Sequence, residues 1–264
     1  MSGQTNTTTP YRRRAAQAER AAARSTLYRF LSLGFLYPEA ENLARLRSGI
    51  EEAAVCLKFL GYSHVLPTLH SAREALPLTC KALEKHYLKT WGHTISPTCS
   101  PYEMEYGPAH IYQKTQGLAD VSGFYHAFGL KLSSQTRERP DHLSMELEFM
   151  HFLTWKEVYG LKQGHDSEKV TLCRQAQAKF LEEHLNWLHL FAQGLSQKAE
   201  GSFLAIWGQL VEDFLSLEAQ SMGVTFQKPK PAQERTWQEA RDEECTSCPH
   251  ALVEDGSTNP RRSL

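Results

Sequence analysis

The stretch from Leu143 to Leu161 constrains the fold most, because it predicts a long helix that is apolar on most of its sides. Pro140 and Asp141 are helix-start signals, since proline fits the first turn and an aspartate side chain accepts hydrogen bonds from unpaired amides. Only Gly160 weakens the helical pattern that follows, so we expect about five turns. A helix with apolar residues on several sides is surrounded by other elements and lies at the centre of a bundle.

The rest of the chain also predicts helices, and no alternating apolar and polar run predicts a strand. Tyr37-Pro38 ends one predicted helix and Gly61 ends the next. We expect helices over residues 12–36, 39–60, 67–91, about 118–130, 143–161, 166–198 and 200–221. The fold class is therefore all-α, a single helical bundle domain of about six to eight helices.

Both ends of the chain differ in composition from this domain. Residues 1–10 are polar and rich in helix breakers, which predicts a disordered N-terminus. Residues 11–223 hold the helical domain, and residues 224–264 form a polar, proline-bearing tail that contains a Cys-x-x-Cys motif. We expect this tail to be disordered as well.

Bulk properties exclude several classes of protein. A formal net charge of -1 over 264 residues provides no basic field for nucleic acid. No apolar run reaches the ~18 residues of a membrane span. Arg12-Arg13-Arg14 is followed by charged sequence rather than by the apolar core of an export signal. We expect a cytoplasmic protein that binds neither nucleic acid nor membrane.

Residues 93–108 predict a long irregular loop, because they contain three prolines and a glycine. The loop is rich in aromatic residues, which is unusual for a solvated linker. Two interpretations stay open: a functional loop, or a loop held to the core by Tyr102 and Tyr106.

Residues 131–139 form a charged linker into the central helix. Because two protomers could exchange helices across this linker, both a monomer and a domain-swapped dimer remain open.

A metal centre in the bundle has partial support. A carboxylate-bridged di-iron site needs two Glu-x-x-His motifs, and the chain has one, formed by Glu148 and His151. His142 and Glu146 point away from that pair on the helical wheel, so one ion cannot bind both pairs.

The tail contains half of the ligands of a zinc or iron–sulfur site. The weak metal candidates are Cys245, Cys248 and His250. No nucleophile motif or phosphate-binding loop is present, so we do not expect an enzyme. A metal-binding helical protein that uses these tail residues, or Glu148 with His151, remains the alternative, and a structural subunit of a respiratory complex is a third possibility.

A binding surface is the remaining hypothesis. Aromatic and acidic residues gather at one helix end, on the long loop and at the start of the central helix: Tyr87, Trp91, Pro101, Tyr102, Tyr106, Pro140, Asp141, His142 and Glu146. Such a set suits an apolar peptide that carries basic residues, through burial of rings and charge-assisted hydrogen bonds. His142 would tune the affinity near neutral pH.

These residues resemble the motifs of a known family. Pro140-Asp141-His142-Leu143-Ser144-Met145-Glu146-Leu147-Glu148-Phe149-Met150 resembles the Pro-Asp-His-x-x-x-Glu-Leu-x-x-Met block of the TorD/DmsD-like, NarJ-related redox enzyme maturation chaperones. Ser100-Pro101-Tyr102-Glu103-Met104-Glu105-Tyr106 is similar to the loop element of that family, although Glu103 and Met104 depart from its usual residues. Tyr87-Leu88-Lys89-Thr90-Trp91 is similar to a looser upstream segment.

The resemblance implies a cytoplasmic assembly chaperone. Members bind the twin-arginine leader of the catalytic subunit of a molybdenum oxidoreductase. They hold that subunit until its molybdopterin guanine dinucleotide is inserted, and they bind no cofactor of their own.

Carried over by motif, the leader-binding residues would be Tyr102, Tyr106, Pro140, Asp141 and His142, with Glu146 as support. We expect a groove between the loop and the central helix to take the apolar part of the leader, with Asp141 facing its arginines. The client stays open among reductases and dehydrogenases that act on N-oxides, sulfoxides, selenate, chlorate or hydrocarbons.

Overall fold

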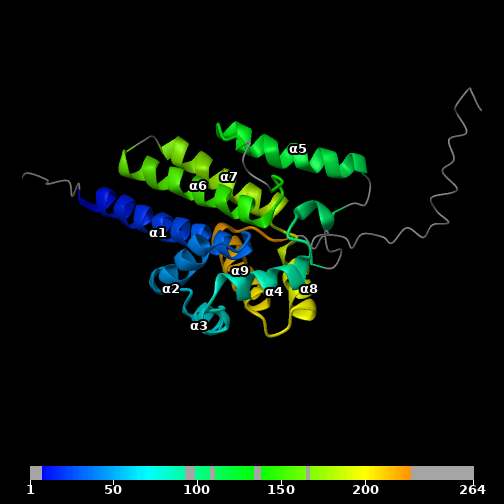
Figure 1. The fold of residues 1–264 in the computed structure, drawn as a ribbon. Coiled ribbons are helices and arrows are strands. Elements are labelled where there is room, and N and C mark those ends of the chain that lie inside the picture. The colour runs from blue at the N-terminus through cyan, green and yellow to red at the C-terminus, as the bar shows by residue number, and fades with distance from the viewer. Residues whose placement is uncertain (1–7, 93–98, 108–110, 134–137, 165–166, 227–264) are drawn as a thin grey trace, which may run out of the picture. The chain divides into compact units, whose positions relative to one another are not determined.

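The structure is a computed structural model that describes residues 8–92, 99–107, 111–133, 138–164 and 167–226, all within one compact unit. These residues form α-helices and short 3-10 helices and contain no strand (Figure 1), which confirms the all-α prediction. The α-helices are α1 (Thr8–Ser32), α2 (Ala40–Leu60), α3 (Leu66–Ala75), α4 (Cys80–Trp91), α5 (Ile111–Ala127), α6 (Leu143–Lys162), α7 (Ser167–His184), α8 (Leu188–Lys198) and α9 (Phe203–Met222). The 3-10 helices are η1 (Leu33–Phe35), η2 (Ser63–Val65) and η3 (Glu103–Glu105).

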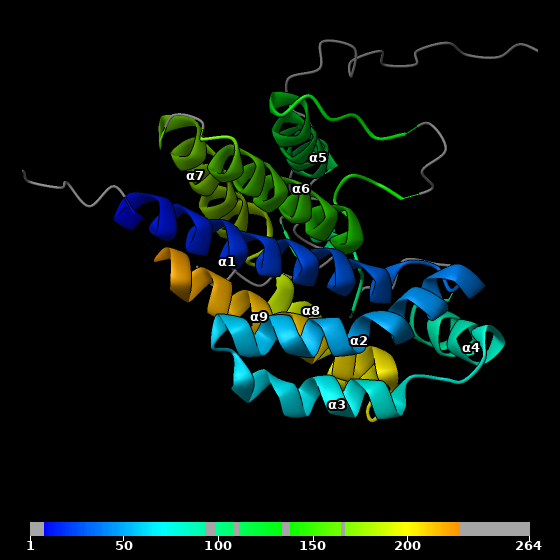
Figure 2. The same ribbon diagram turned by 90° about the vertical axis from the view of Figure 1, so that its left-hand side faces the viewer.

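The predicted central helix is α6, and its position is confirmed. α6 packs mainly against α1 and α7. α1 in turn runs between α6 on one side and α2 with α9 on the other (Figure 2). Buried side chains occur on most sides of α6, among them Leu143, Leu147, Phe149, Met150 and Leu153. A surface helix would bury only one stripe, so this pattern identifies α6 as the axis of the bundle.

The described chain has more α-helices than the six to eight that the sequence predicts, because two predicted helices are each broken in two. The helix expected over 67–91 stops at Ala75 because Pro77 lacks an amide hydrogen and clashes with the preceding turn. A new helix then begins after Thr79, whose side chain accepts a hydrogen bond from the amide of Ala82 at 3.2 Å. The residue that stops the first helix, Pro77, and the residue that caps the second, Thr79, are both visible in the sequence.

The second break, within the helix expected over 166–198, has a tertiary cause. Residues 185–187 leave the helical path although they include neither proline nor glycine. The turn buries Trp187 almost completely and lets its Nε1 donate to the carbonyl of His184 at 2.9 Å. Burial of an indole contributes several times the free energy of one helical hydrogen bond, so packing overrides the local pattern. His184 consequently becomes the last residue of α7.

Two helix ends show how the boundaries arise. α2 ends at Gly61, as predicted, and Gly61 adopts a left-handed φ of 86° that a side chain would disfavour. α1 begins at Thr8, inside the segment 1–10 that was expected to be disordered. Pro10 is compatible with this start because proline is tolerated in the first helical turn. Residues 1–7 lie outside the described chain, as does the predicted tail from residue 227 onward.

A buried ionic network joins four helices. Arg24 of α1 donates from Nε to Glu218 of α9 at 2.6 Å and from a terminal nitrogen to Glu157 of α6 at 3.4 Å. Its other terminal nitrogen donates to Gln177 of α7 at 2.8 Å. Both glutamates are completely buried, and their charges are balanced by Arg24 and, for Glu157, also by Arg174 at 2.6 Å.

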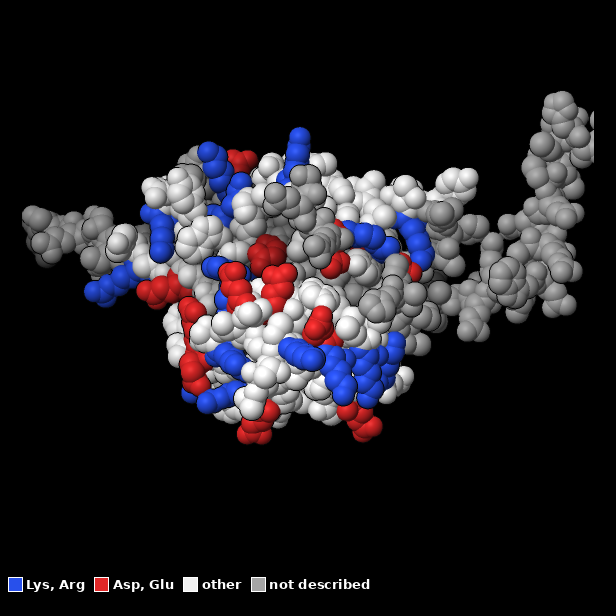
Figure 3. All heavy atoms as spheres, viewed as in Figure 1, with Lys and Arg blue, Asp and Glu red and all other residues white. Residues whose placement is uncertain are grey.

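The outer surface mixes charges of both signs. On the face shown in Figure 3, Lys and Arg side chains alternate with Asp and Glu side chains, in keeping with the net charge of -1. Among the helices of the described ranges, none combines the length and apolar character needed to cross a membrane.

Candidate functional site

The loop segment 99–107 is joined to the turn before α6 by backbone hydrogen bonds. The amide of Leu143 donates to the carbonyl of Pro101 at 2.9 Å, and the amide of Glu103 donates to the carbonyl of Asp141 at 2.9 Å. The two segments therefore lie as close as neighbouring strands, and no peptide fits between them. The predicted groove between the loop and the central helix is therefore absent along residues 99–107, while residues 93–98 and 108 of that loop lie outside the described residues.

His142, not the predicted Asp141, caps the start of α6. Its Nδ1 accepts a hydrogen bond from the amide of Ser144 at 3.2 Å. The imidazole is completely buried against Tyr102, with ring centroids 5.0 Å apart. Burial lowers the pKa of His142 to about 4, despite the opposing charges of Glu138 and Asp141. The side chain is neutral at physiological pH, so the expectation that it tunes binding near neutrality is wrong.

Asp141 is completely buried and is neutralised by Arg139 of the same turn. Arg139 donates from Nε to one carboxylate oxygen at 2.8 Å and from a terminal nitrogen to the other at 2.6 Å. The second oxygen also accepts from the amide of Met104 at 3.1 Å. The hydrogen bond to Asp141 is the first cause of the raised pKa of Arg139. The carboxylate thus holds η3 against α6, and it is not positioned to face the arginines of a peptide.

Aromatic side chains hold the loop to the core. Trp91 donates from Nε1 to the carbonyl of Cys99 at 2.8 Å, and the hydroxyl of Tyr106 donates to the carbonyl of Ser100 at 2.9 Å. The ring of Tyr106 stacks on Trp187 with centroids 4.9 Å apart. Of the two interpretations that the sequence leaves open, these contacts favour a loop held to the core.

The remaining residues predicted for the site complete the same cluster. Tyr102 donates its hydroxyl to Glu138 at 2.5 Å, and the Tyr87 ring packs edge-on against Trp91 with centroids 4.6 Å apart. Pro101 is buried, and the carbonyl of Pro140 accepts from the hydroxyl of Tyr125 at 2.7 Å. The structure therefore brings the predicted residues together, with most of their polar groups paired to one another.

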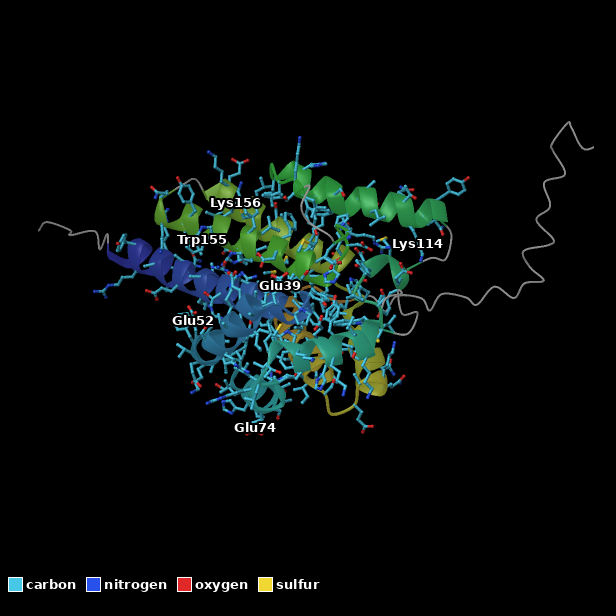
Figure 4. All side chains as sticks on the ribbon, viewed as in Figure 1. Glu39, Glu52, Glu74, Lys114, Trp155 and Lys156 are labelled. Carbon is cyan, nitrogen blue, oxygen red and sulfur yellow. The ribbon has the colours of Figure 1, made fainter. Side chains whose placement is uncertain are left out.

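An open groove of about 760 Å³ lies on the other side of η3, between η3, α5 and the C-terminal half of α7. Lys114 projects from α5 (Figure 4) and binds Glu105 at 2.7 Å, which ties α5 to η3 outside the groove. The apolar lining includes Met104, Tyr106 and Phe124. The charged lining consists of Glu103, Asp120 and Glu183 against Lys179. The groove is thus partly apolar and has an excess of acidic groups.

The floor of the groove contains a group of buried titratable side chains. Nδ1 of His184 lies 3.2 Å from both carboxylate oxygens of Glu103. Glu146 is completely buried behind them, next to Glu103 and Trp187, and its carboxyl oxygens form no hydrogen bond of standard geometry within the described residues. Burial, followed by the charges of Glu103 and Asp141, raises the pKa of Glu146 well above its usual range. Burial also raises the pKa of Glu103, and His184 opposes this shift. These effects favour the protonated, neutral form of Glu146 beneath Glu103.

Sequence reasoning missed the groove residues of α5 and α7. His184 and Glu183 lie at the end of α7 only because the helix breaks before Trp187, and no local sequence motif predicts that break. On α5, the glycines Gly117 and Gly123 were a usable signal, since glycine inside a helical segment often marks a close approach or an open side.

The predicted metal candidates of α6 have other partners. Glu148 accepts from the hydroxyl of Ser32 at 2.8 Å, and Nδ1 of His151 lies 2.8 Å from Oγ of Ser25, so both face α1. In the described part of the chain, no group of three or more His, Cys, Asp or Glu side chains could hold a metal ion. The tail candidates at positions 245, 248 and 250 lie outside the described residues.

Comparison with known proteins places the chain in a family. The family model described as "Nitrate reductase delta subunit" matches residues 60–193, about half of the chain, and this span contains η3, α4, α5, α6 and α7. The chain is 29% identical over 214 residues to the perchlorate reductase assembly chaperone protein of Dechloromonas aromatica (strain RCB), across 77% of this chain and 92% of that protein.

Two further relatives match over shorter spans. The selenate reductase assembly chaperone protein of Thauera selenatis is 37% identical over 98 residues, which cover 36% of this chain and 49% of that protein. The chlorate reductase assembly chaperone protein of Ideonella dechloratans is 32% identical over 117 residues, which cover 44% of this chain and 58% of that protein. This chain belongs to the nitrate reductase delta subunit family, as one of its TorD-like redox enzyme maturation chaperones.

Proposed function

We propose that this protein is a cytoplasmic assembly chaperone for the catalytic subunit of a molybdenum oxidoreductase. It binds the twin-arginine leader and the apo form of that subunit, and it assists insertion of molybdopterin guanine dinucleotide before export. The observation that carries the proposal is the likeness to the perchlorate reductase assembly chaperone, which extends over 77% of this chain and 92% of that protein. In this role the protein catalyses no reaction, and the cofactor belongs to its client.

The client is proposed to be a reductase of an oxyanion. Three relatives are named as assembly chaperones of perchlorate, selenate and chlorate reductases. The substrates in these names are oxyanions of chlorine or selenium. The sequence leaves several client classes open, and the names of these relatives favour the reductases of selenate, chlorate and similar oxyanions.

The groove between η3, α5 and α7 is the proposed binding site for the leader. Its apolar side chains suit the apolar part of a leader, and its excess of acidic groups suits basic residues. Of the residues predicted from sequence, Tyr106 lines this groove directly. The other predicted residues act indirectly, by holding η3 in place as one wall of the groove. They include Asp141, His142 and the aromatic side chains that fasten the loop to the core.

Gly123 allows a direct test, because a Cβ added there meets no atom within 4 Å and the residue lines the groove. Gly123→Leu fills the groove from within α5 while improving helix propensity by about 0.8–1 kcal/mol. We expect this variant to fold as well as the parent and to bind a synthetic twin-arginine leader at least about tenfold more weakly, measured by isothermal titration calorimetry.

His126→Leu is the matched control, since His126 is exposed on the same helix and does not line the groove. It adds the same side chain and should leave the affinity unchanged. Equal affinity of the parent and Gly123→Leu would exclude the groove as the leader site. If the parent protein failed to bind the leader, and the apo catalytic subunit acquired its cofactor equally well without the chain, the proposed function would be wrong.

A further inference from the structure

The floor of the groove holds acidic groups that lack a cation. Glu103 faces the groove from η3, and its side chain is 11% exposed. The neighbouring basic residues are already paired: Arg139 with Asp141 and Glu105, Lys114 with Glu105, and the groove residue Lys179 with Glu183 at 3.9 Å. Across the described ranges, no Lys or Arg side chain forms an ion pair with Glu103 or Glu146.

The groups around Glu103 come from every element packed against it. α7 contributes His184, α6 contributes Glu146, the turn before α6 contributes Asp141, and α5 contributes the buried phenol of Tyr125. Within the described ranges, His184 is the basic side chain that lies within hydrogen-bond distance of Glu103. Glu146 is completely buried beside Glu103 and Trp187, and no hydrogen bond of standard geometry reaches its carboxyl oxygens from the described residues. A buried acid without a partner is destabilising unless its environment changes when a ligand binds.

We propose that the groove floor is a subsite for one cationic side chain of the bound peptide, a guanidinium or ammonium group that contacts Glu103, and that its binding releases a proton from the Glu103–Glu146 pair. This inference rests on the proposed function and adds a specificity residue and a linked proton to it.

Each carboxylate oxygen of Glu103 has more than one lone pair, so Glu103 accepts from a guanidinium without losing its contact with His184. A cation placed there, away from bulk water, then favours the ionised form of both carboxyl groups. The proton that Glu146 carries in the free protein is consequently transferred to solvent.

An organic cation fits the groove better than a metal ion. The described residues provide no group of three or more metal-ligating side chains, and the surrounding lining of Met104, Tyr106 and Phe124 is apolar. A long side chain of arginine or lysine pairs an apolar stem with a charged head, which matches an apolar wall above an acidic floor.

The sign of the pH dependence follows from the proton release. The free protein holds one more proton than the complex, so affinity for the cationic peptide rises with pH wherever the free pair is protonated. A peptide without the cation does not displace the proton, and its affinity does not show this rise.

The test compares two synthetic leaders that differ only in charge: one with arginines, and one with citrulline, the neutral isostere, at the same positions. Titrations in phosphate and in Tris, which differ in ionisation enthalpy, report the number of protons released. We expect the arginine leader to bind about tenfold more tightly than the citrulline leader. We also expect proton release with the arginine leader alone.

Three variants assign the effect to residues. Glu103→Gln should remove the discrimination between the two leaders, and Glu146→Gln should keep the discrimination but abolish proton release. Glu182→Gln is the matched control, because Glu182 is an exposed carboxylate of α7 and does not line the groove. It should behave as the parent.

The outcomes separate the two proposals. If both leaders bind the parent equally well without proton release, the subsite is overturned while the chaperone function stands. If discrimination persists in Glu103→Gln, the cation is recognised elsewhere, and the subsite is again overturned. If neither leader binds the parent, the proposed leader-binding function fails together with the subsite. The comparison of leaders on the parent protein does not depend on the folding of any variant.

Discussion

Arg139 holds the carboxylate of Asp141 through two hydrogen bonds, at 2.8 Å and 2.6 Å, and its guanidinium also lies 4.4 Å from the centre of the Tyr102 ring. The acid that the sequence motif assigns to the arginines of a leader is therefore already paired with an arginine of its own chain. This pair fastens η3 to the start of α6, and η3 forms one wall of the groove.

The first prediction concerns this pair. Arg139→Gln leaves the completely buried Asp141 without its cation, so we expect a loss of stability of about 2 kcal/mol. The loss is smaller than for a fully buried pair because Arg139 is partly exposed. Urea unfolding of the variant measures it. The double variant Arg139→Gln/Asp141→Asn should recover part of the loss, and a greater loss in the double variant would contradict the pairing.

The second prediction concerns His142 and acid. The pKa of His142 is about 4 in the folded protein, below the 6.5 that is usual for histidine, so below pH 6.5 the unfolded chain takes up a proton that the folded chain excludes. Stability attributable to this group is therefore complete above pH 6.5 and is lost as pH falls toward 4, by on the order of 3 kcal/mol. His142→Asn keeps a capping side chain and removes the titration.

Unfolding free energies of the parent and His142→Asn, measured between pH 7.5 and pH 4.5, check this prediction. The parent should lose more stability than the variant as the pH falls. Parallel curves for the two proteins would show that His142 is not held neutral by burial.

The third prediction concerns Glu146. The pKa of Glu146 is raised in the folded protein. At a pH above the usual pKa of a glutamate, the unfolded chain therefore loses the proton of this side chain while the folded chain keeps it. The folded state therefore loses stability as pH rises through this window. Glu146→Gln is permanently neutral, and we expect it to be more stable than the parent at pH 7, with the difference shrinking toward pH 4.

Thermal unfolding at the two pH values measures this difference. Glu148→Gln is the matched control on the same helix, because its side-chain oxygen can still accept from Ser32 as Glu148 does at 2.8 Å. It should show no comparable gain at pH 7. A destabilised Glu146→Gln at pH 7 would mean that Glu146 is ionised and paired in the folded protein.

The fourth prediction concerns the buried network between α1 and α9. Arg24→Met leaves Glu218 buried without its cation, which lies 2.6 Å away in the parent, and we expect a loss of about 3–5 kcal/mol. Glu157 retains Arg174 at 2.6 Å, so Glu218 carries most of the effect. A double-mutant cycle with Glu218→Gln measures the coupling directly, and additive losses would show that the pair does not interact.

Much of the fold could be predicted from local sequence signals. The apolar pattern of residues 143–161 identified α6 and its central position, and Gly61 marked the end of α2. The break between α3 and α4 was also encoded locally, by Pro77 and Thr79, although the apolar spacing across 67–91 concealed it. These signals act within a few residues, through backbone geometry, capping and helical periodicity.

The candidate site was predictable only in part. The motifs located the residues that cluster around η3 and the start of α6, but not which of their polar groups remain available. A motif shows residue types and spacing. Whether Asp141 faces a ligand or Arg139, and whether His142 titrates near neutrality, depends on burial and on partners from other segments.

By itself, the sequence determined an all-α bundle built on α6 and the family motifs along the loop and the turn before α6. The tertiary structure alone decided where the open groove lies and what forms its floor. Burial of Trp187 breaks the helix after His184, and that break brings His184 against Glu103, with Glu146 behind it. No local pattern encodes this arrangement, because its driving force is the packing of an indole against Tyr106 from a distant segment of the chain.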